Sequence, residues 1–319
     1  MKTTNHNLLG VGFVILALLT FSLQDIAVKG MGGRYPVLEI VLLRTIVSIP
    51  CTLLLFYYEG GRGFPTTQQS RLELLRGFLL FLSFTAYMMA LAALPLAEIA
   101  AIRNSAPLII TLLSVVWLNE KVGLRHWLAL IVGFIGVLLI VRLGSAGFNL
   151  GSVFILLSTL FYALSVMLTR QLRSTDSSAT MAYYSSLVYL VAALIVIPIV
   201  LWVGEIPNAH PSIAFVFRAW QMPSVLDFLI MCALGALWAS GMYFMARAYS
   251  FTEASVIAPF EYVTLPINVF WGFAIWHEFL TLLTWAGAFL TLLSGLYILN
   301  LGQEKPSIKA AKINLNHSD

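Results

Sequence analysis

The chain has 319 residues, of which 60% are hydrophobic and only 10% charged, and its formal net charge is +4. Soluble domains carry about 25% charged residues, so a soluble fold of this length could not bury so much apolar surface. The apolar runs continue for roughly 20 residues, the length that an α-helix needs to cross a bilayer. A β-barrel would show short segments of alternating polarity instead. The composition therefore predicts an all-α integral membrane protein.

The apolar runs predict ten transmembrane helices. Their expected ranges, in chain order, are 8–28, 36–57, 74–94, 96–118, 124–142, 149–169, 180–203, 225–249, 254–276 and 280–301. Two longer polar loops are expected at 58–73 and 204–224. Residues 303–319 lack an apolar period, and we expect them to form a disordered cytoplasmic tail.

Basic residues alternate in density from one connection to the next, which predicts the orientation. With the N-terminus inside, the outer segments carry only Lys29, Arg34, Arg142 and Arg218. Both termini are therefore predicted to be cytoplasmic. The inner segments carry Lys2, Arg62, Arg71, Arg76, Lys121, Arg125, Arg170, Arg173, Arg247, Lys305, Lys309 and Lys312.

The two halves of the chain resemble each other weakly. Each has a stretch that begins with small residues, contains a mid-span proline and ends in a glutamate. Because five spans is an odd number, two similar halves must lie in opposite orientations, and inverted repeats of this kind bind solute near the midplane. We therefore expect one five-helix repeat over 1–145 and a second over 146–302. The matching positions are Ala97 to Ala101, Pro107 and Glu120, and Ala254 to Ala258, Pro266 and Glu278.

Two further motifs accompany these stretches: Leu42-Leu43-Arg44 in the second span and Leu75-Arg76-Gly77 at the start of the third. With them the sequence resembles the drug/metabolite transporter superfamily, in its EamA-like branch. The resemblance implies ten helices around a central cavity lined by spans 1, 3, 4, 6, 8 and 9. It also implies solute transport, since similar proteins move amino acids, S-adenosylmethionine, riboflavin and other metabolites.

Charged residues inside the spans are the leading candidates for solute contact, because each needs a partner or a wet cavity. Arg103 and Glu261 occupy nearly equivalent places before the prolines of spans 4 and 9. They could bind opposite ends of a zwitterionic solute, with Glu261 also exchanging a proton, or they could form a structural ion pair. Glu39, Arg76 and Glu98 lie near span ends, where we expect solvent to reach them.

Asp25 and Arg44 form a second candidate pair. Arg44 could reach Asp25 or Glu39 in a structural ion pair, or Asp25 could act as a coupling carboxylate for protons. Deep aromatic side chains could stack on a planar solute, although such residues more often pack in a core. The expected substrate-binding residues are Arg103, Asn104, Glu261, Tyr262, Tyr162, Tyr87, Trp238 and Tyr243.

Stripes of small and polar residues run along spans 4, 6 and 9. Asn104 and Glu261 belong to two of them, for which we expect a wet cavity. The alternative for such stripes is a helix-packing seam, which we expect for Gly133, Gly136, Gly287 and Gly295.

These features favour a secondary transporter of the bacterial inner membrane that moves a small polar or zwitterionic metabolite by alternating access. The alternatives are a polyspecific drug efflux carrier, which Arg103 disfavours, a lipid-modifying enzyme and a lipid-handling protein. No Walker loop, hydrolase elbow or metal-binding set occurs in the sequence. We expect no enzymatic activity, no cofactor, no metal and no nucleic-acid partner. Protons are the candidate coupling ion, and the chain is expected to be a monomer or a homodimer.

Overall fold

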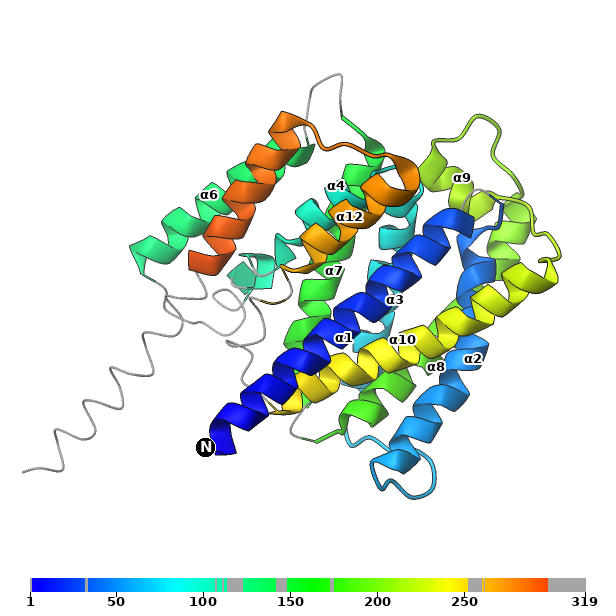
Figure 1. Ribbon diagram of the computed structural model, residues 1–319. Coiled ribbons are helices and arrows are strands. Elements are labelled where there is room, and N and C mark those ends of the chain that lie inside the picture. The colour runs from blue at the N-terminus through cyan, green and yellow to red at the C-terminus, as the bar shows by residue number, and fades with distance from the viewer. Residues whose placement is uncertain are drawn as a thin grey trace, which may run out of the picture.

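The computed structural model describes residues 2–31, 34–106, 108–110, 112–113, 123–141, 148–172, 175–251, 260 and 262–297, and these residues contain helices and no strand (Figure 1). Helices are the expected outcome, because a helix satisfies its backbone hydrogen bonds within one segment in lipid. The labelled helices are α1 (Lys2–Met31), α2 (Val37–Tyr58), α3 (Ser70–Leu91), α4 (Leu96–Arg103), α6 (Leu124–Val141), α7 (Leu150–Leu172), α8 (Ser178–Val203), α9 (Pro211–Phe217), α10 (Val225–Phe251) and α12 (Thr264–Trp276).

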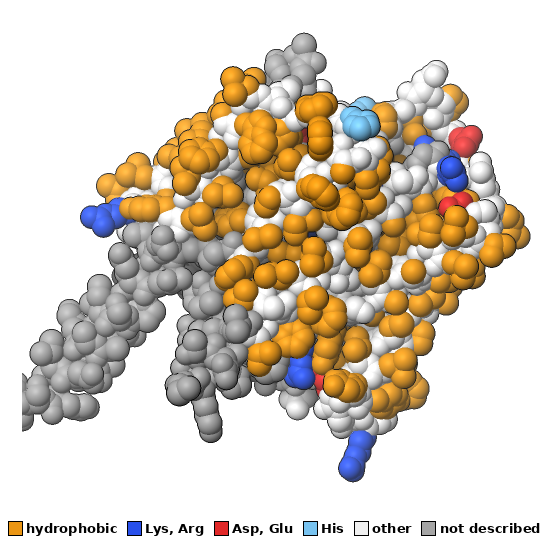
Figure 2. All heavy atoms as spheres, in the orientation of Figure 1, with side chains coloured by type: hydrophobic (Ala, Val, Ile, Leu, Met, Phe, Trp, Pro, Cys, Tyr) orange, Lys and Arg blue, Asp and Glu red, His pale blue; other side chains and the backbone are white. Residues whose placement is uncertain are grey.

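Six of these helices are long and apolar enough to cross a membrane: α1, α2, α3, α7, α8 and α10. Three shorter apolar helices lie at Trp127–Val141, Thr264–Trp276 and Leu282–Tyr297. Hydrophobic side chains are spread across the whole described surface in Figure 2, and few charged ones lie among them. The all-α membrane fold is thus confirmed, whereas the count of ten spans stays a prediction because several expected segments lie partly outside the described residues.

Helix packing follows the expected internal repeat. By chain order, the helices α1, α2, α3 and α4 of the first half correspond to α7, α8, α10 and α12 of the second. Exchanging the halves therefore turns the contact between α3 and α7 into the contact between α10 and α1. These two pairs make the most extensive helix contacts in the described chain. The pairs α2 with α8 and α4 with α12 map onto themselves, and both are in contact. Such exchange of contacts is what a two-fold relation between the halves produces.

The spans that contain Pro107 and Pro266 have turns near their middle, whereas α2 and α8 continue through Pro50 and Pro198. A continuous helix was expected over 96–118, but α4 ends at Arg103 and a turn follows at Asn104 and Ser105. Pro107 explains the break, because a proline ring clashes with the carbonyl four residues earlier, here that of Arg103. In the second half α12 begins only at Thr264, so that Pro266 falls in its first turn, where proline is tolerated.

The glycines of α6 and of the helix Leu282–Tyr297 allow two backbones to approach closely. A Cβ atom at Gly136 would lie 2.7 Å from the carbonyl oxygen of Gly287, and one at Gly287 would lie 2.5 Å from that of Gly136. Thr291 also donates a hydrogen bond of 3.4 Å to the carbonyl of Gly133. The packing seam predicted for these glycines is confirmed. Gly295 instead accommodates the hydroxyl of Tyr262.

Arg76 lies near the beginning of α3 and connects three helices. Its guanidinium donates to the hydroxyl of Thr169 in α7 at 2.8 Å and to that of Ser185 in α8 at 3.0 Å. It also forms an ion pair of 3.2 Å with Glu73, and the Arg76 residue is only 4% exposed. The expectation of solvated side chains at span ends was therefore wrong for Arg76, and also for the buried Glu39, because neighbouring helices cover both.

Candidate functional site

A buried carboxylate lies where α1, α3 and α12 meet. Asp25 is 3% exposed, and its Oδ2 accepts a hydrogen bond of 2.6 Å from the hydroxyl of Tyr87. The side-chain amide of Asn268 is a second hydrogen-bonding partner of this carboxylate. Asn268 itself accepts from the hydroxyl of Ser22 at 3.2 Å. Three helices from both halves of the chain thus supply polar groups to one buried point.

Arg103 adds a positive charge to this cluster. Its guanidinium carbon lies 5.2 Å from the ring centroid of Tyr87 and 5.8 Å from that of Tyr162 in α7. It is also close enough to Asp25 to interact with it electrostatically. The break after α4 places Arg103 at the last turn of a helix that ends inside the protein. Asp25, Tyr87, Arg103, Tyr162 and Asn268 are called the central cluster below.

A second buried charge, Arg44 of α2, lies against three aromatic rings. Its guanidinium carbon is 3.8 Å from the ring centroid of Phe84, 4.5 Å from that of Trp238 and 5.5 Å from that of Tyr189. Arg44 is 0% exposed. Within the described ranges, none of its three side-chain nitrogens has a hydrogen-bond acceptor. We call Arg44 with Phe84, Trp238 and Tyr189 the arginine cage.

The ion pair that the sequence suggested for Arg44 is absent among the described residues, whether with Asp25 or with Glu39. Arg44 faces the rings of α3, α8 and α10, whereas Asp25 faces Tyr87 and Asn268. Glu39 instead accepts a long hydrogen bond of 3.5 Å from the backbone of Gln221. The central cluster and the arginine cage are nevertheless adjacent. Phe84 of the cage and Tyr87 of the cluster lie three residues apart on one face of α3.

The remaining expected residues are distributed differently. Tyr243 lies beside Arg247, whose guanidinium carbon is 5.6 Å from its ring centroid. Tyr262 lies against Gly295, and Asn104 is buried in the turn after α4. Glu261 lies outside the described residues, so the expected pairing of Arg103 with Glu261 stays a prediction.

Sequence reasoning missed Phe84 and Tyr189 as neighbours of Arg44. An apolar residue one turn before Tyr87 could have been suspected, because residues i and i+3 share a helix face. No sequence signal connects Tyr189 with either charge. The stripe on α7 also serves packing in part, since the Ser83 hydroxyl donates to the carbonyl of Ser158 at 2.9 Å.

An all-helical membrane fold with an internal repeat and buried charges at its centre is typical of multi-pass membrane transporters. The chain belongs to the EamA-like transporter family, whose sequence pattern matches residues 8–142 and again residues 149–300. The resemblance to the drug/metabolite transporter superfamily is confirmed by this double match. The chain is accordingly a transporter and not an enzyme.

Several characterised transporters are similar over almost the whole chain. The S-adenosylmethionine uptake transporter of Rickettsia felis is 26% identical over 92% of this chain and 92% of that protein. The riboflavin transporter of Vibrio cholerae is 29% identical, with 93% and 95% covered. The pseudopaline exporter of Pseudomonas aeruginosa is 29% identical, with 88% and 92% covered.

A solved crystal structure has the same fold, with a TM-score of 0.60 at 16% identity over 93% of this chain and 98% of the other. The bacterial relatives and the membrane-spanning helices together indicate a multi-pass protein of the bacterial inner membrane.

Proposed function

We propose that this protein is a secondary transporter that moves a small polar or zwitterionic organic metabolite across the inner membrane by alternating access. The observation that carries the proposal is the juxtaposition of the buried Asp25 carboxylate with Tyr87 and Arg103 at the junction of the two halves. Buried charges in a membrane protein are expensive, so their retention marks a solute or ion pathway. Both termini are proposed to be cytoplasmic, as the loop charges favour.

The charges support a solute that carries both signs. Asp25 offers a site for a cationic group, while Arg103 and Arg44 offer sites for an anionic one. Phe84 and Tyr87 are separated by a rise of about 4.5 Å along α3, so the side chains that contact Arg44 and Asp25 occupy neighbouring positions on that helix. The rings of the cage add a surface for a planar group.

Other expected residues remain part of the proposed site. Glu261 is retained from the sequence alone, as the second carboxylate of the pathway and a candidate proton exchanger. Tyr162, Trp238 and Asn104 line the same region, and Tyr243 and Tyr262 would contact solute nearer the N-terminal end of α1. Arg44, which is buried, and Arg103, which is half-buried, weigh against polyspecific efflux of lipophilic cations, because such a pathway would favour carboxylates alone.

Relatives named for S-adenosylmethionine and riboflavin transport supply the first solutes to test. The purified protein would be reconstituted into liposomes, and uptake of labelled S-adenosylmethionine, riboflavin and a set of amino acids would be measured. We expect saturable uptake of at least one of them, lost in Asp25→Asn. The matched control is Asp227→Asn, which removes a buried carboxylate outside the central cluster, beside Arg34 and Tyr35. Equal loss in both variants, or no uptake of any solute, would contradict the proposal.

A further inference from the structure

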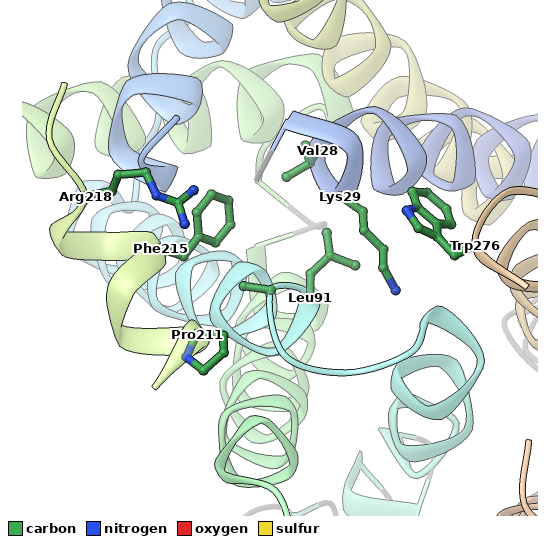
Figure 3. Close-up of a pocket in the computed structure, with 8 residues that line it drawn as sticks. Val28, Lys29, Leu91, Pro211, Phe215, Arg218 and Trp276 are labelled. Carbon is green, nitrogen blue, oxygen red and sulfur yellow. The ribbon is translucent and has the colours of Figure 1, made fainter. Parts of the chain in front are cut away.

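A small cavity lies at the end of the bundle remote from the N-terminus, one turn of α1 beyond Asp25. Its volume is about 210 Å³. Lys29 and Trp276 lie on one side of it, Phe215 and Arg218 lie on the other, and Leu91 lies between them (Figure 3). Among the residues that the structure describes, the lining carries two cations and no carboxylate. We call this cavity the vestibule.

Lys29 is held in place by a set of contacts from both halves of the chain. Its Nζ lies 2.5 Å from Oε1 of Glu278 and 3.1 Å from the carbonyl oxygen of Leu94, and 5.0 Å from the ring centroid of Trp276. The other oxygen of Glu278 accepts a hydrogen bond of 3.0 Å from the backbone of Leu96, at the start of α4. Lys29, Glu278 and the turn at Leu94–Leu96 form what we call the clasp.

The clasp lies beside the vestibule and one turn of α1 from the central cluster. Asp25 and Lys29 are four residues apart on α1, so they share a face and are separated by a rise of about 6 Å. Lys29 lines the vestibule and its side chain is 12% exposed, so a carboxylate that enters the vestibule can approach Lys29. Glu278 is therefore a competitor for any anion that approaches Lys29.

Charge and size together indicate what the vestibule binds. By sequence this end of the bundle carries few cations, and two of them, Lys29 and Arg218, line a single cavity. Complete pockets for small molecules are usually about 300–1,000 Å³, so the vestibule can hold one end of a metabolite and not the whole. Trp276 and Phe215 provide the aromatic surfaces beside the two charges.

We propose that the vestibule is a capture site for the carboxylate end of a ring-bearing organic metabolite, whose carboxylate displaces Glu278 from Lys29 and so loosens the clasp. This inference rests on the proposed transport function. Beyond that function, it specifies that the solute carries a carboxylate. It also specifies that this carboxylate first contacts the protein at the vestibule, on the side of the membrane opposite the termini. The ion pair between Lys29 and Glu278 joins α1 to the end of α12. Displacement of Glu278 by the solute would therefore allow α1 and α12 to separate.

The test uses indole-3-acetate, a ring with a carboxylate, and its neutral counterpart indole-3-acetamide. Affinities would be measured from the thermal stabilisation of the purified, full-length protein in detergent. We expect the acetate to bind and the acetamide to bind at least about tenfold more weakly, because a charge-assisted hydrogen bond contributes enough for such a ratio. Arg218→Gln should reduce acetate affinity by a similar factor. Equal affinity for the two compounds, or none for the acetate, would overturn the proposal.

Glu278→Gln distinguishes competition from mere support of the fold. If Glu278 competes with the solute, the variant binds acetate more tightly than the wild type. If Glu278 only positions Lys29, the variant binds more weakly, and the displacement proposal fails. Lys29→Gln should abolish the preference for the anion. Lys29→Gln leaves the Glu278 carboxylate without its ion pair and so could prevent folding. In that case the double variant Lys29→Gln/Glu278→Gln removes both charges and must show the same loss of preference for the anion.

Arg34→Gln is the matched control, since it removes a cation from the same end of the bundle without touching the vestibule. Arg34 is exposed and lies 3.7 Å from Asp227. Asp227 also accepts a hydrogen bond from the Tyr35 hydroxyl at 2.7 Å, which raises the pKa of Tyr35 and keeps it protonated. Loss of binding in Arg34→Gln equal to that in Arg218→Gln would mean a general charge effect and no capture site.

Failure of this inference is separable from failure of the proposed function. Acetate binding is measured without transport, so absent binding in a protein that still takes up metabolite refutes only the capture site. Intact vestibule binding in a protein that transports none of the tested solutes refutes only the proposed function.

Discussion

The hydroxyl of Tyr87 donates a 2.6 Å hydrogen bond to Oδ2 of Asp25, joining α3 to α1 at a point that solvent does not reach. Removing the donor in Tyr87→Phe leaves the carboxylate with fewer partners, which should cost about 1–3 kcal/mol in the free energy of unfolding. We expect solute uptake to fall by about tenfold, since a tenfold change corresponds to about 1.4 kcal/mol, which lies within that range. Proteoliposome uptake and thermal unfolding of the same preparation would measure both effects.

The same pair provides a test of proton coupling. If Asp25 exchanges a proton, Asp25→Asn should abolish uptake driven by a pH gradient while exchange of labelled for unlabelled solute continues. If Asp25→Asn retains gradient-driven uptake, another group must exchange the proton. Glu261 is the candidate that the sequence offers for that role.

Arg44 provides a separate prediction, because its charge is buried, lies against three aromatic rings and has no hydrogen-bond acceptor among the described residues. A buried charge without an ion-pair partner is costly to desolvate, so its replacement by an apolar side chain of similar length need not destabilise the fold. Arg44→Met should therefore fold with unchanged or higher thermal stability and yet lose uptake of anionic and zwitterionic solutes. Unfolding of the Arg44→Met protein would instead show that the cation–π contacts with Phe84 and Trp238 hold the fold.

The glycine seam gives a prediction about stability alone. Gly136→Ala places a methyl group 2.7 Å from the carbonyl oxygen of Gly287, and overpacking of this kind costs about 1–3 kcal/mol. Gly12→Ala is the control, because a Cβ there meets nothing within 4 Å and alanine is favoured over glycine in a helix by roughly 0.5–1 kcal/mol. Thermal unfolding should show a lower midpoint for the first variant and an equal or higher one for the second.

Arg76 supports a prediction at the opposite end of α3 from Leu91. Arg76→Met removes the hydrogen bonds to α7 and α8 and leaves the buried Glu73 without its ion pair, which should cost about 3–5 kcal/mol. The double variant Glu73→Gln/Arg76→Met should recover part of that loss, because no uncompensated charge remains. Expression level and detergent unfolding would report both. Absence of any recovery would assign the loss to the hydrogen bonds with Thr169 and Ser185.

Much of the fold could be predicted from the sequence because lipid imposes a simple rule on the chain. Apolar runs of membrane-crossing length must become helices, and the expected bounds of α2, α6, α7, α8 and α10 agree with the structure to within a few residues. The prolines were less informative, because Pro107 follows the end of α4 while Pro50 and Pro198 lie within continuous helices. The seam of Gly136 and Gly287 was predictable for a local reason, since only small residues let helices approach so closely.

The partners of the charged residues were not predictable in the same way. The sequence alone determined that Asp25, Arg44 and Arg103 each need a partner or a wet cavity, because each lies inside an apolar run. Only the tertiary structure decided that Asp25 bonds with Tyr87 and Asn268, that Arg44 faces Phe84 and Trp238, and that Lys29 meets Glu278 across 249 residues of sequence. Helix periodicity fixes which face a side chain occupies, but the rotation and pairing of whole helices depend on packing along their full length.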